Sequence, residues 1–220
     1  MRIRFKKWAR PELEACNFYI DNPEDYIGKW RELFNNDNPI YIELGCGKGS
    51  FISQLASQNK KINYIAVDLV DAMLGLAKRK IEETYKEKNL EIDNIKITRY
   101  DIERILNIFN KDDHIERIYI NFCNPWPRGK HHKKRLTHAR QLEKYNQFLA
   151  DNSEIYFKTD DDNLFNDSLG YFTKTGYEIE KKTYDLEMEE NFWNNIETEH
   201  EKMFKEQGIK IKALIAKLKR

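Results

Sequence analysis

A glycine-rich loop preceded by an acid is the first segment of this sequence whose residue types could bind a ligand. It reads Glu43-Leu44-Gly45-Cys46-Gly47-Lys48-Gly49 and follows the β-rich residues 39–44. Glycines at alternate positions let the backbone turn sharply and let a ligand come close to the chain. A second acid, Asp68, ends the next strand-like run, where a carboxylate can hold the two hydroxyls of a ribose. The pattern predicts a nucleoside site.

The spacing of the glycines indicates which nucleoside fits. Gly45, Gly47 and Gly49 do not form the G-x-G-x-x-G pattern that cradles a pyrophosphate. The leading acid, Glu43, would repel a pyrophosphate but suits the cationic amino and sulfonium groups of S-adenosylmethionine. The alternative interpretation is an ordinary strand-to-helix turn with incidental glycines. Asp101, after the third predicted strand, could approach an adenine, cap the helix that begins at Ile102, or do both.

A second candidate segment, Asn121-Phe122-Cys123-Asn124-Pro125-Trp126-Pro127, follows the fourth predicted strand. Two prolines restrict this loop and push the residue before each of them towards an extended backbone. A rigid loop at the carboxyl end of a strand suits a reaction that depends on positioning. The alternative is a proline-bearing turn around a core tryptophan.

Composition and charge limit the class of protein. The 220 residues carry 38 basic and 37 acidic side chains, and 40% are hydrophobic, which excludes a disordered chain. The basic residues cluster at the N-terminus, from 128 to 140 and at the C-terminus, so phosphate backbones are possible partners. No apolar run reaches the roughly 18–20 residues of a membrane span, and no signal peptide is recognisable. The three separated cysteines favour a reducing cytosol and argue against a zinc site, so a cytoplasmic protein without a metal is expected.

Strand-like and helix-like segments alternate along the chain. The predicted strands cover residues 39–44, 62–68, 95–100, 115–122, 153–159, 177–184 and 209–218. The predicted helices cover residues 23–35, 48–58, 70–88, 102–109, 138–150, 162–174 and 197–207. This alternation predicts an α/β fold with a mostly parallel seven-stranded sheet, an antiparallel edge and helices on both faces. We expect a single domain over residues 1–220 with a basic N-terminal arm of about 20 residues.

The motifs together resemble a known family. The glycine loop resembles the first motif of class I S-adenosylmethionine-dependent methyltransferases, which have a Rossmann-like fold. The Asn-Pro-Trp-Pro loop and the segments Arg128–Thr137, Phe157–Asp160 and Thr198–Glu201 resemble, in order, those of the bacterial tRNA (guanine-N7-)-methyltransferases. The family more often has aspartate at the position of Asn124, lysine at that of Arg128 and tyrosine at that of His200. The Asn124 difference puts in doubt any mechanism that needs a carboxylate there.

The resemblance implies methyl transfer from S-adenosylmethionine to N7 of a guanosine in the variable loop of tRNA. The cofactor-binding residues it implies are Glu43, Gly45, Gly47, Gly49, Asp68, Asp101 and Asn124, with Asn124 also the catalytic residue. The implied guanosine-binding residues are Arg128, Asp160, Thr198, Glu199, His200 and Glu201. The implied contacts to the tRNA backbone are Lys130, His131, Lys133, Lys134 and Arg135, in a segment that reads as a mobile loop.

Several of these residues have a structural alternative. Asp160 could cap the helix that follows it, helped by Asp161 and Asp162. Thr198 and Glu201 have the spacing of a capping box.

The reaction itself needs little chemistry from the protein. Guanine N7 has an in-plane lone pair and no proton, so no general base is required, and Asn124 is expected to position rather than deprotonate the base. The alternatives are a methyltransferase acting on another RNA atom or a small molecule, a non-catalytic RNA-binding subunit and, more distantly, a nicotinamide oxidoreductase. A monomer or homodimer without an obligate protein partner is expected.

Overall fold

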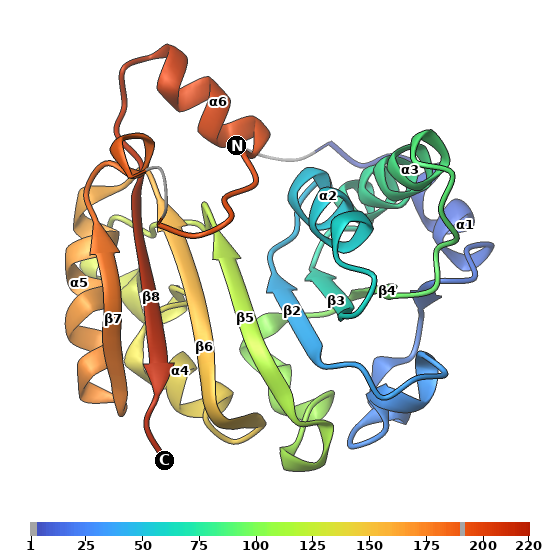
Figure 1. Ribbon diagram of the computed structural model, residues 1–220, viewed down its shortest axis with the longest axis horizontal. Coiled ribbons are helices and arrows are strands. Elements are labelled where there is room, and N and C mark those ends of the chain that lie inside the picture. The colour runs from blue at the N-terminus through green and yellow to red at the C-terminus, as the bar shows by residue number, and fades with distance from the viewer. Residues whose placement is uncertain (1–3, 190–191) are drawn as a thin grey trace. The chain divides into compact units, whose positions relative to one another are not determined.

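The computed structural model describes residues 4–189 and 192–220, and it divides into two compact units, residues 1–113 and 114–220, each described by itself below (Figure 1). Arg2 of the predicted basic arm lies outside the described residues.

The first unit is built around parallel strands in the order β1-β4-β3-β2. Residues 63–67 of β3 are fully buried, as expected of a strand with a neighbour on both sides. Its elements are α1 (Ala9–Glu14), β1 (Tyr19–Ile20), β2 (Ile40–Leu44), α2 (Ser50–Gln58), β3 (Asn63–Asp68), α3 (Asp71–Glu87) and β4 (Ile95–Arg99). Short 3-10 helices cover Pro23–Tyr26, Trp30–Leu33, Ile102–Asn107 and Lys111–Asp113.

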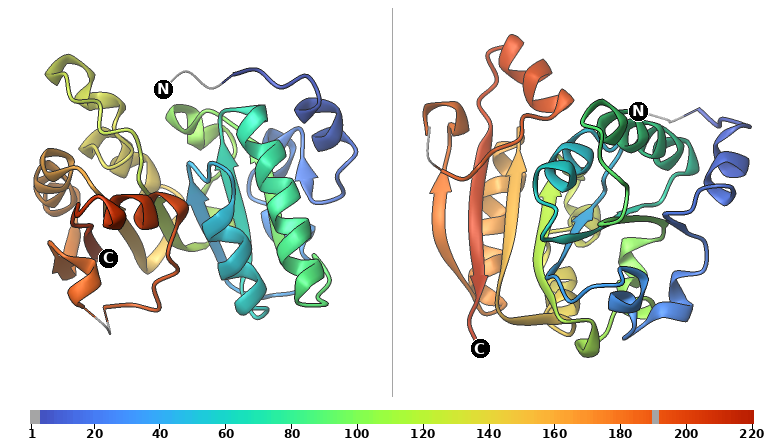
Figure 2. Two further views of the ribbon diagram at one scale, coloured as in Figure 1. Left: turned by 90° about the horizontal axis from the view of Figure 1, so that it is seen from above. Right: turned by 45° about the vertical axis from the view of Figure 1, so that its right-hand side comes forward.

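Helix α3 is the scaffold of this unit, with α2 alongside it, as Figure 2 shows from above. At Gly49 the two helices come so close that an added Cβ would lie 2.7 Å from Cβ of Ala77, and the φ of +76° also favours glycine. Helix α1 packs on the same helix: the Arg79 guanidinium lies 3.7 Å from the Trp8 ring centroid and binds Glu12. The predicted N-terminal arm is therefore anchored by a helix from residue 9 onwards.

The second unit combines one parallel and two antiparallel strand pairs. Its elements are β5 (Ile115–Asn121), α4 (Ala139–Tyr145), β6 (Leu149–Thr159), α5 (Asp162–Lys174), β7 (Tyr177–Thr183), α6 (Glu199–Glu206) and β8 (Lys212–Leu218). Strand β5 pairs in parallel with β6, and β8 lies antiparallel to both β6 and β7. Helix α5 packs behind these strands in Figure 1. A bulge between Ile179 and Lys181 interrupts β7.

The predicted fold class, mostly parallel α/β with an antiparallel edge, is confirmed. Several boundaries were predicted wrongly. The helix over residues 23–35 is two 3-10 helices separated by Gly28, whose φ is +73°. The helix over 138–150 ends at Tyr145, because Leu149 already belongs to β6. The mobile loop after residue 128 is a 3-10 helix, Gly129–Lys134. Helix α1 and the two-residue strand β1 were missed.

No helix in residues 4–189 and 192–220 is long and apolar enough to span a membrane. In the same residues, no three or more His, Cys, Asp or Glu side chains are grouped so that they could hold a metal ion.

Candidate functional site

The glycine loop joins β2 to α2 with its three glycines at positive φ, between +55° and +80°. The loop is held against the neighbouring strand by the N–H of Gly45, which donates to Val67 O at 2.8 Å. An added Cβ on Gly47 would meet no atom within 4 Å, so the backbone there borders open space. Glu43, the last residue but one of β2, is 2% exposed. The loop therefore offers an accessible backbone beside a buried carboxylate.

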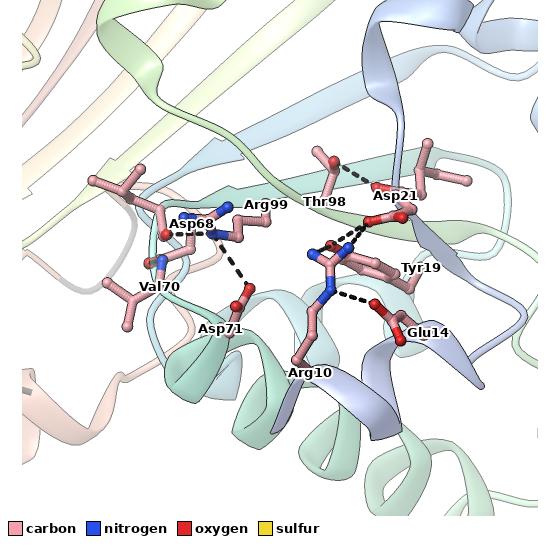
Figure 3. Close-up of polar contacts among 11 residues, drawn as sticks. Arg10, Glu14, Tyr19, Asp21, Asp68, Val70, Asp71, Thr98 and Arg99 are labelled. Carbon is pink, nitrogen blue, oxygen red and sulfur yellow. Dashed lines mark hydrogen bonds and ion pairs between the residues drawn. The ribbon is translucent and has the colours of Figure 1, made fainter. Parts of the chain in front are cut away.

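Asp68 fixes this loop from the end of β3. Its Oδ2 accepts from the Gly47 N–H at 2.9 Å and its Oδ1 from the Val70 N–H at 3.0 Å. The ion pair between Arg99 and Asp71 lies close by (Figure 3). Burial raises the pKa of Asp68 above its ordinary value, while the two backbone donors act in the opposite direction.

Cys46, within the loop, is close to the acids Asp68 and Glu43. Burial raises the pKa of the Cys46 thiol well above its ordinary value, and the negative charges of Asp68 and Glu43 raise it further. Two carboxylates thus make the potential at the loop negative. A cationic ligand suits this potential, and a pyrophosphate does not.

Asp101 has the capping role that was one of its two interpretations. Its Oδ1 accepts from the Glu103 N–H at 3.0 Å, at the start of a 3-10 helix. It also lines a pocket of about 370 Å³ in the first unit, whose other lining residues are Asp21, Asn22, Pro23, Glu24, Leu69, Arg99, Tyr100 and Arg104. The cap is confirmed, and a contact with adenine stays a prediction.

The Asn-Pro-Trp-Pro loop in the second unit is conformationally unusual. Phe122 and Trp126 have φ values of +51° and +43°, a region that bulky residues rarely adopt. Asn124, between them, is exposed, and its Oδ1 accepts from the Trp126 N–H at 3.0 Å. This side chain therefore shapes the loop, and its amide has no basic lone pair for proton abstraction.

The residues predicted to bind the tRNA backbone have different exposures. Lys130, Lys133 and Lys134 are exposed, and Lys134 lies 5.0 Å from the centroid of the Trp126 ring. His131 is half-buried beside the same ring, at 5.8 Å between centroids. Arg135 is buried and bonded within the protein. The geometry brings the three lysines to the surface and Arg135 into the interior.

The crowding of cations here should be measurable at His138. Burial, followed by the positive charges of Lys133 and Arg135 among others, lowers the pKa of His138 below 6.5. We expect Lys133→Ala to raise this pKa, because it removes a repelling charge from the protonated imidazole. An NMR titration of the His138 ring checks this, with Lys182→Ala on β7 as control. An unchanged value would show that Lys133 points away from the imidazole.

Asp160 follows β6 and is half-buried. The predicted alternative, that it caps α5, is wrong: Asp161 is the cap, and its Oδ1 accepts from the Leu164 N–H at 2.7 Å. Burial and then the neighbouring Asp161 raise the pKa of Asp160, whereas Lys212 and His200 lower it. The exposed His200 ring stacks on Phe122 at 5.9 Å, so the end of β5 and the start of α6 adjoin.

The Thr198–Glu201 segment begins α6 with a complete capping box. The Thr198 side chain accepts from the Glu201 N–H at 3.0 Å. Glu201 is fully buried and its Oε2 binds Lys158 Nζ at 2.6 Å. Lys158, 1% exposed, also donates to Asn195 Oδ1 and to Ile196 O. Of the predicted guanosine-binding residues in this segment, Glu199 and His200 are exposed, whereas Thr198 and Glu201 are committed to the fold.

Sequence reasoning missed Lys158 and the buried role of Arg135. A lysine directly after the apolar residues 155–157 was visible at position 158, but its partner Glu201 lies 43 residues further on. The spacing gave no signal for that contact.

The comparisons define first the class of protein. A family model described as a putative methyltransferase matches residues 37–214, and the chain belongs to that family. Solved structures agree at the level of the fold. A 16S rRNA methyltransferase, KamB, has a TM-score of 0.63 at 12% identity over 87% of this chain and 93% of its own. A putative methyltransferase from Thermoplasma acidophilum has a TM-score of 0.54 at 14% identity, over 84% of this chain and 70% of its own.

Curated relatives narrow the family. The tRNA (guanine-N(7)-)-methyltransferase of Clostridium beijerinckii is 59% identical over 98% of both chains. The enzyme of the same name from Ruminiclostridium cellulolyticum is 59% identical over 100% of this chain and 93% of its own. The chain therefore belongs to the family of tRNA (guanine-N(7)-)-methyltransferases.

Proposed function

We propose that this protein transfers a methyl group from S-adenosylmethionine to N7 of a guanosine in tRNA. The observation that carries the proposal is the near full-length 59% identity to curated enzymes of that name. The negative potential at the glycine loop supports the cofactor, and the exposed lysines of residues 130–134 support the tRNA.

The first unit provides residues that fit the cofactor. Glu43 and Asp68 supply negative charge for a molecule with sulfonium and amino cations. The open backbone at Gly47 lets a ligand approach closely. Gly45 and Gly49 complete the turn, and we assign Asp101 to the adenine side. When bound, S-adenosylmethionine supplies an electrophilic methyl group.

The second unit provides the groups for the base. We assign Asp160, Glu199 and Arg128 to the guanosine, because Glu199 and Arg128 are exposed and Asp160 is only half-buried. The exposed His200 ring, next to Glu199 in the chain and stacked on Phe122, offers a flat surface. Thr198 and Glu201 hold the start of α6 in place.

Asn124 positions the reaction and does not act as a base. Guanine N7 already has a free lone pair, so acceleration comes from alignment and exclusion of water. The hydrogen bond from the Trp126 N–H fixes the Asn124 side chain and leaves its NH₂ group as a donor. Asparagine therefore suffices where the family more often has aspartate.

Methyl transfer from labelled S-adenosylmethionine to unmodified tRNA transcripts, with the product nucleoside identified, tests the proposal. N7-methylguanosine is the expected product, and replacing the variable-loop guanosine should abolish it. Another methylated nucleoside would overturn the assignment of the target atom. Binding of cofactor and tRNA without transfer would favour an RNA-binding subunit.

The exposed lysines should contribute to tRNA affinity through charge. We expect Lys133→Ala with Lys134→Ala to weaken tRNA binding and to reduce the slope of log Kd against log salt concentration by roughly one to two. The reason is that fewer counterions are released on binding when fewer phosphates are contacted. Cofactor affinity should stay unchanged. The measurement is a filter-binding salt titration, with Lys86→Ala plus Lys182→Ala, two exposed lysines elsewhere, as a charge-matched control. An unaltered slope would exclude these two phosphate contacts.

We also propose that residues 1–220 form a single domain, supported by the family match across both units. The proposed tRNA substrate favours a cytoplasmic location. A monomer or homodimer without an obligate protein partner remains our prediction, and light scattering would measure it.

A further inference from the structure

Arg135 is placed unlike the other basic residues of its segment. Its side chain is 1% exposed, and its guanidinium makes three hydrogen bonds inside the second unit. Nε donates to Pro125 O at 2.7 Å, one terminal nitrogen to Asp167 Oδ2 at 2.6 Å and the other to His132 Nε2 at 3.0 Å. A guanidinium used in this way presents no free fork to a phosphate.

The bond to Pro125 O connects Arg135 to the Asn-Pro-Trp-Pro loop. That carbonyl directly follows Asn124 in the chain and directly precedes Trp126, which has a strained backbone. A loop with such a conformation persists only when its surroundings hold it. Arg135 is one of the groups that do so.

Helix α5 holds the other end of this connection. Asp167 of this helix accepts the hydrogen bond from Arg135. The hydroxyl of the next residue, Ser168, lies 2.6 Å from the Thr137 hydroxyl in a buried contact. Two successive residues of α5 thus fix the chain on both sides of Leu136. The backbone of Leu136 also hydrogen-bonds the thiol of Cys123, whose pKa burial raises to about 12. The basic segment and the loop are therefore joined at two points.

We propose that Arg135, anchored by Asp167, is a positioning residue that holds the loop around Asn124 in its reactive conformation, and that it does not contact tRNA phosphate. This inference rests on the proposed tRNA methylation. It assigns to Arg135 a role in the rate of transfer, and it leaves affinity for tRNA to the exposed lysines.

Arg135→Lys and Asp167→Asn test the proposal in full-length protein. A lysine has a single nitrogen and lacks the planar guanidinium whose three nitrogens reach Pro125 O, Asp167 and His132 together. An asparagine at position 167 loses the charge that orients the guanidinium. We expect kcat at saturating tRNA to fall at least about tenfold, because small displacements of reacting groups cost that much or more. KM for tRNA and the salt slope of tRNA binding should remain as in the unsubstituted protein.

The matched controls are Arg117→Lys and Glu154→Gln, which alter a second arginine–carboxylate pair of the same unit, with both side chains half-buried and 2.5 Å between the bonded atoms. They should leave kcat within about twofold. Raised KM with a reduced salt slope and unchanged kcat for Arg135→Lys would overturn the proposal, since that result is typical of a lost phosphate contact.

Limited trypsin digestion gives a readout that needs no activity. Loss of the anchor in Asp167→Asn should speed cleavage after Lys130, Lys133 and Lys134 several-fold. The midpoint temperature of thermal unfolding of Asp167→Asn should be no lower than that of Glu154→Gln. If the unsubstituted protein fails to methylate tRNA, the proposed function fails while digestion still tests the anchor. If the enzyme is active but Asp167→Asn is digested at an unchanged rate, the proposed anchoring of Arg135 by Asp167 is overturned while the proposed function stands.

Discussion

Lys158→Met is expected to lower the free energy of unfolding by about 3–5 kcal/mol, because it leaves the Glu201 carboxylate buried without its cation. The pair is almost fully enclosed, with side chains 1% and 0% exposed and 2.6 Å between Nζ and Oε2. Among the residues that the structure describes, the carboxylate then keeps the bonds from Asn195 Nδ2 at 2.6 Å and from the Thr198 N–H at 3.4 Å. Urea unfolding followed by circular dichroism measures the loss.

Two further variants separate charge burial from simple loss of an ion pair. Lys205→Met removes the partner of Glu197 in a more exposed pair, which joins α6 to the residue before its cap, and should cost no more than about 1 kcal/mol. Adding Glu201→Leu to Lys158→Met should restore part of the stability, because no charge is then left buried. A loss for Lys158→Met as small as that for Lys205→Met would mean that water reaches Glu201.

Asp68→Asn is expected to raise the Kd for S-adenosylmethionine by about 10- to 100-fold, since a hydrogen bond to a charged group contributes about 1.5–3 kcal/mol. An asparagine has one acceptor oxygen, so either Gly47 or Val70 loses its partner and faces an NH₂ group. The negative potential at the loop also falls. Calorimetric titration with the cofactor measures the change, and tRNA affinity should not move.

Folding stability should respond differently from affinity. Burial raises the pKa of Asp68, so the folded state holds this proton more tightly than the unfolded state does. The ionised group therefore costs stability at neutral pH, and that cost disappears as the pH falls through the raised pKa. Asparagine relieves the same cost. The control for the cofactor-binding measurement is Asp71→Asn, which changes the neighbouring acid that pairs with Arg99. Equal cofactor affinity in both variants would remove Asp68 from the cofactor site.

Much of the fold was predictable because its signals are local. Alternating apolar strands and helices fixed the order of the elements, and α5 was predicted with the bounds Asp162–Lys174. The caps at Asp101 and Thr198 were also readable, because the residues that complete them lie within three positions. The two 3-10 helices between Pro23 and Leu33 were not, since the positive φ of Gly28 depends on the surrounding chain.

The sequence indicated which residues belong to the candidate site, but not which of them are exposed for binding and which are bonded within the fold. Adjacent basic side chains look equivalent in sequence, yet Lys134 is exposed and Arg135 is buried. What distinguishes them is Asp167, which lies 32 residues away. Glu201 likewise resembles a ligand-binding acid until Lys158 is found beside it.

The bulged strand β7 bears on how this protein behaves at high concentration. Among the described residues β7 pairs with β8 alone, so its outer edge has unpaired backbone groups. Four of its seven residues are charged, Glu178, Glu180, Lys181 and Lys182. A second molecule adding a strand here would have to desolvate those charges and match the irregular register at the bulge. Edge-to-edge aggregation is thereby opposed by the strand's own residues, without a covering helix.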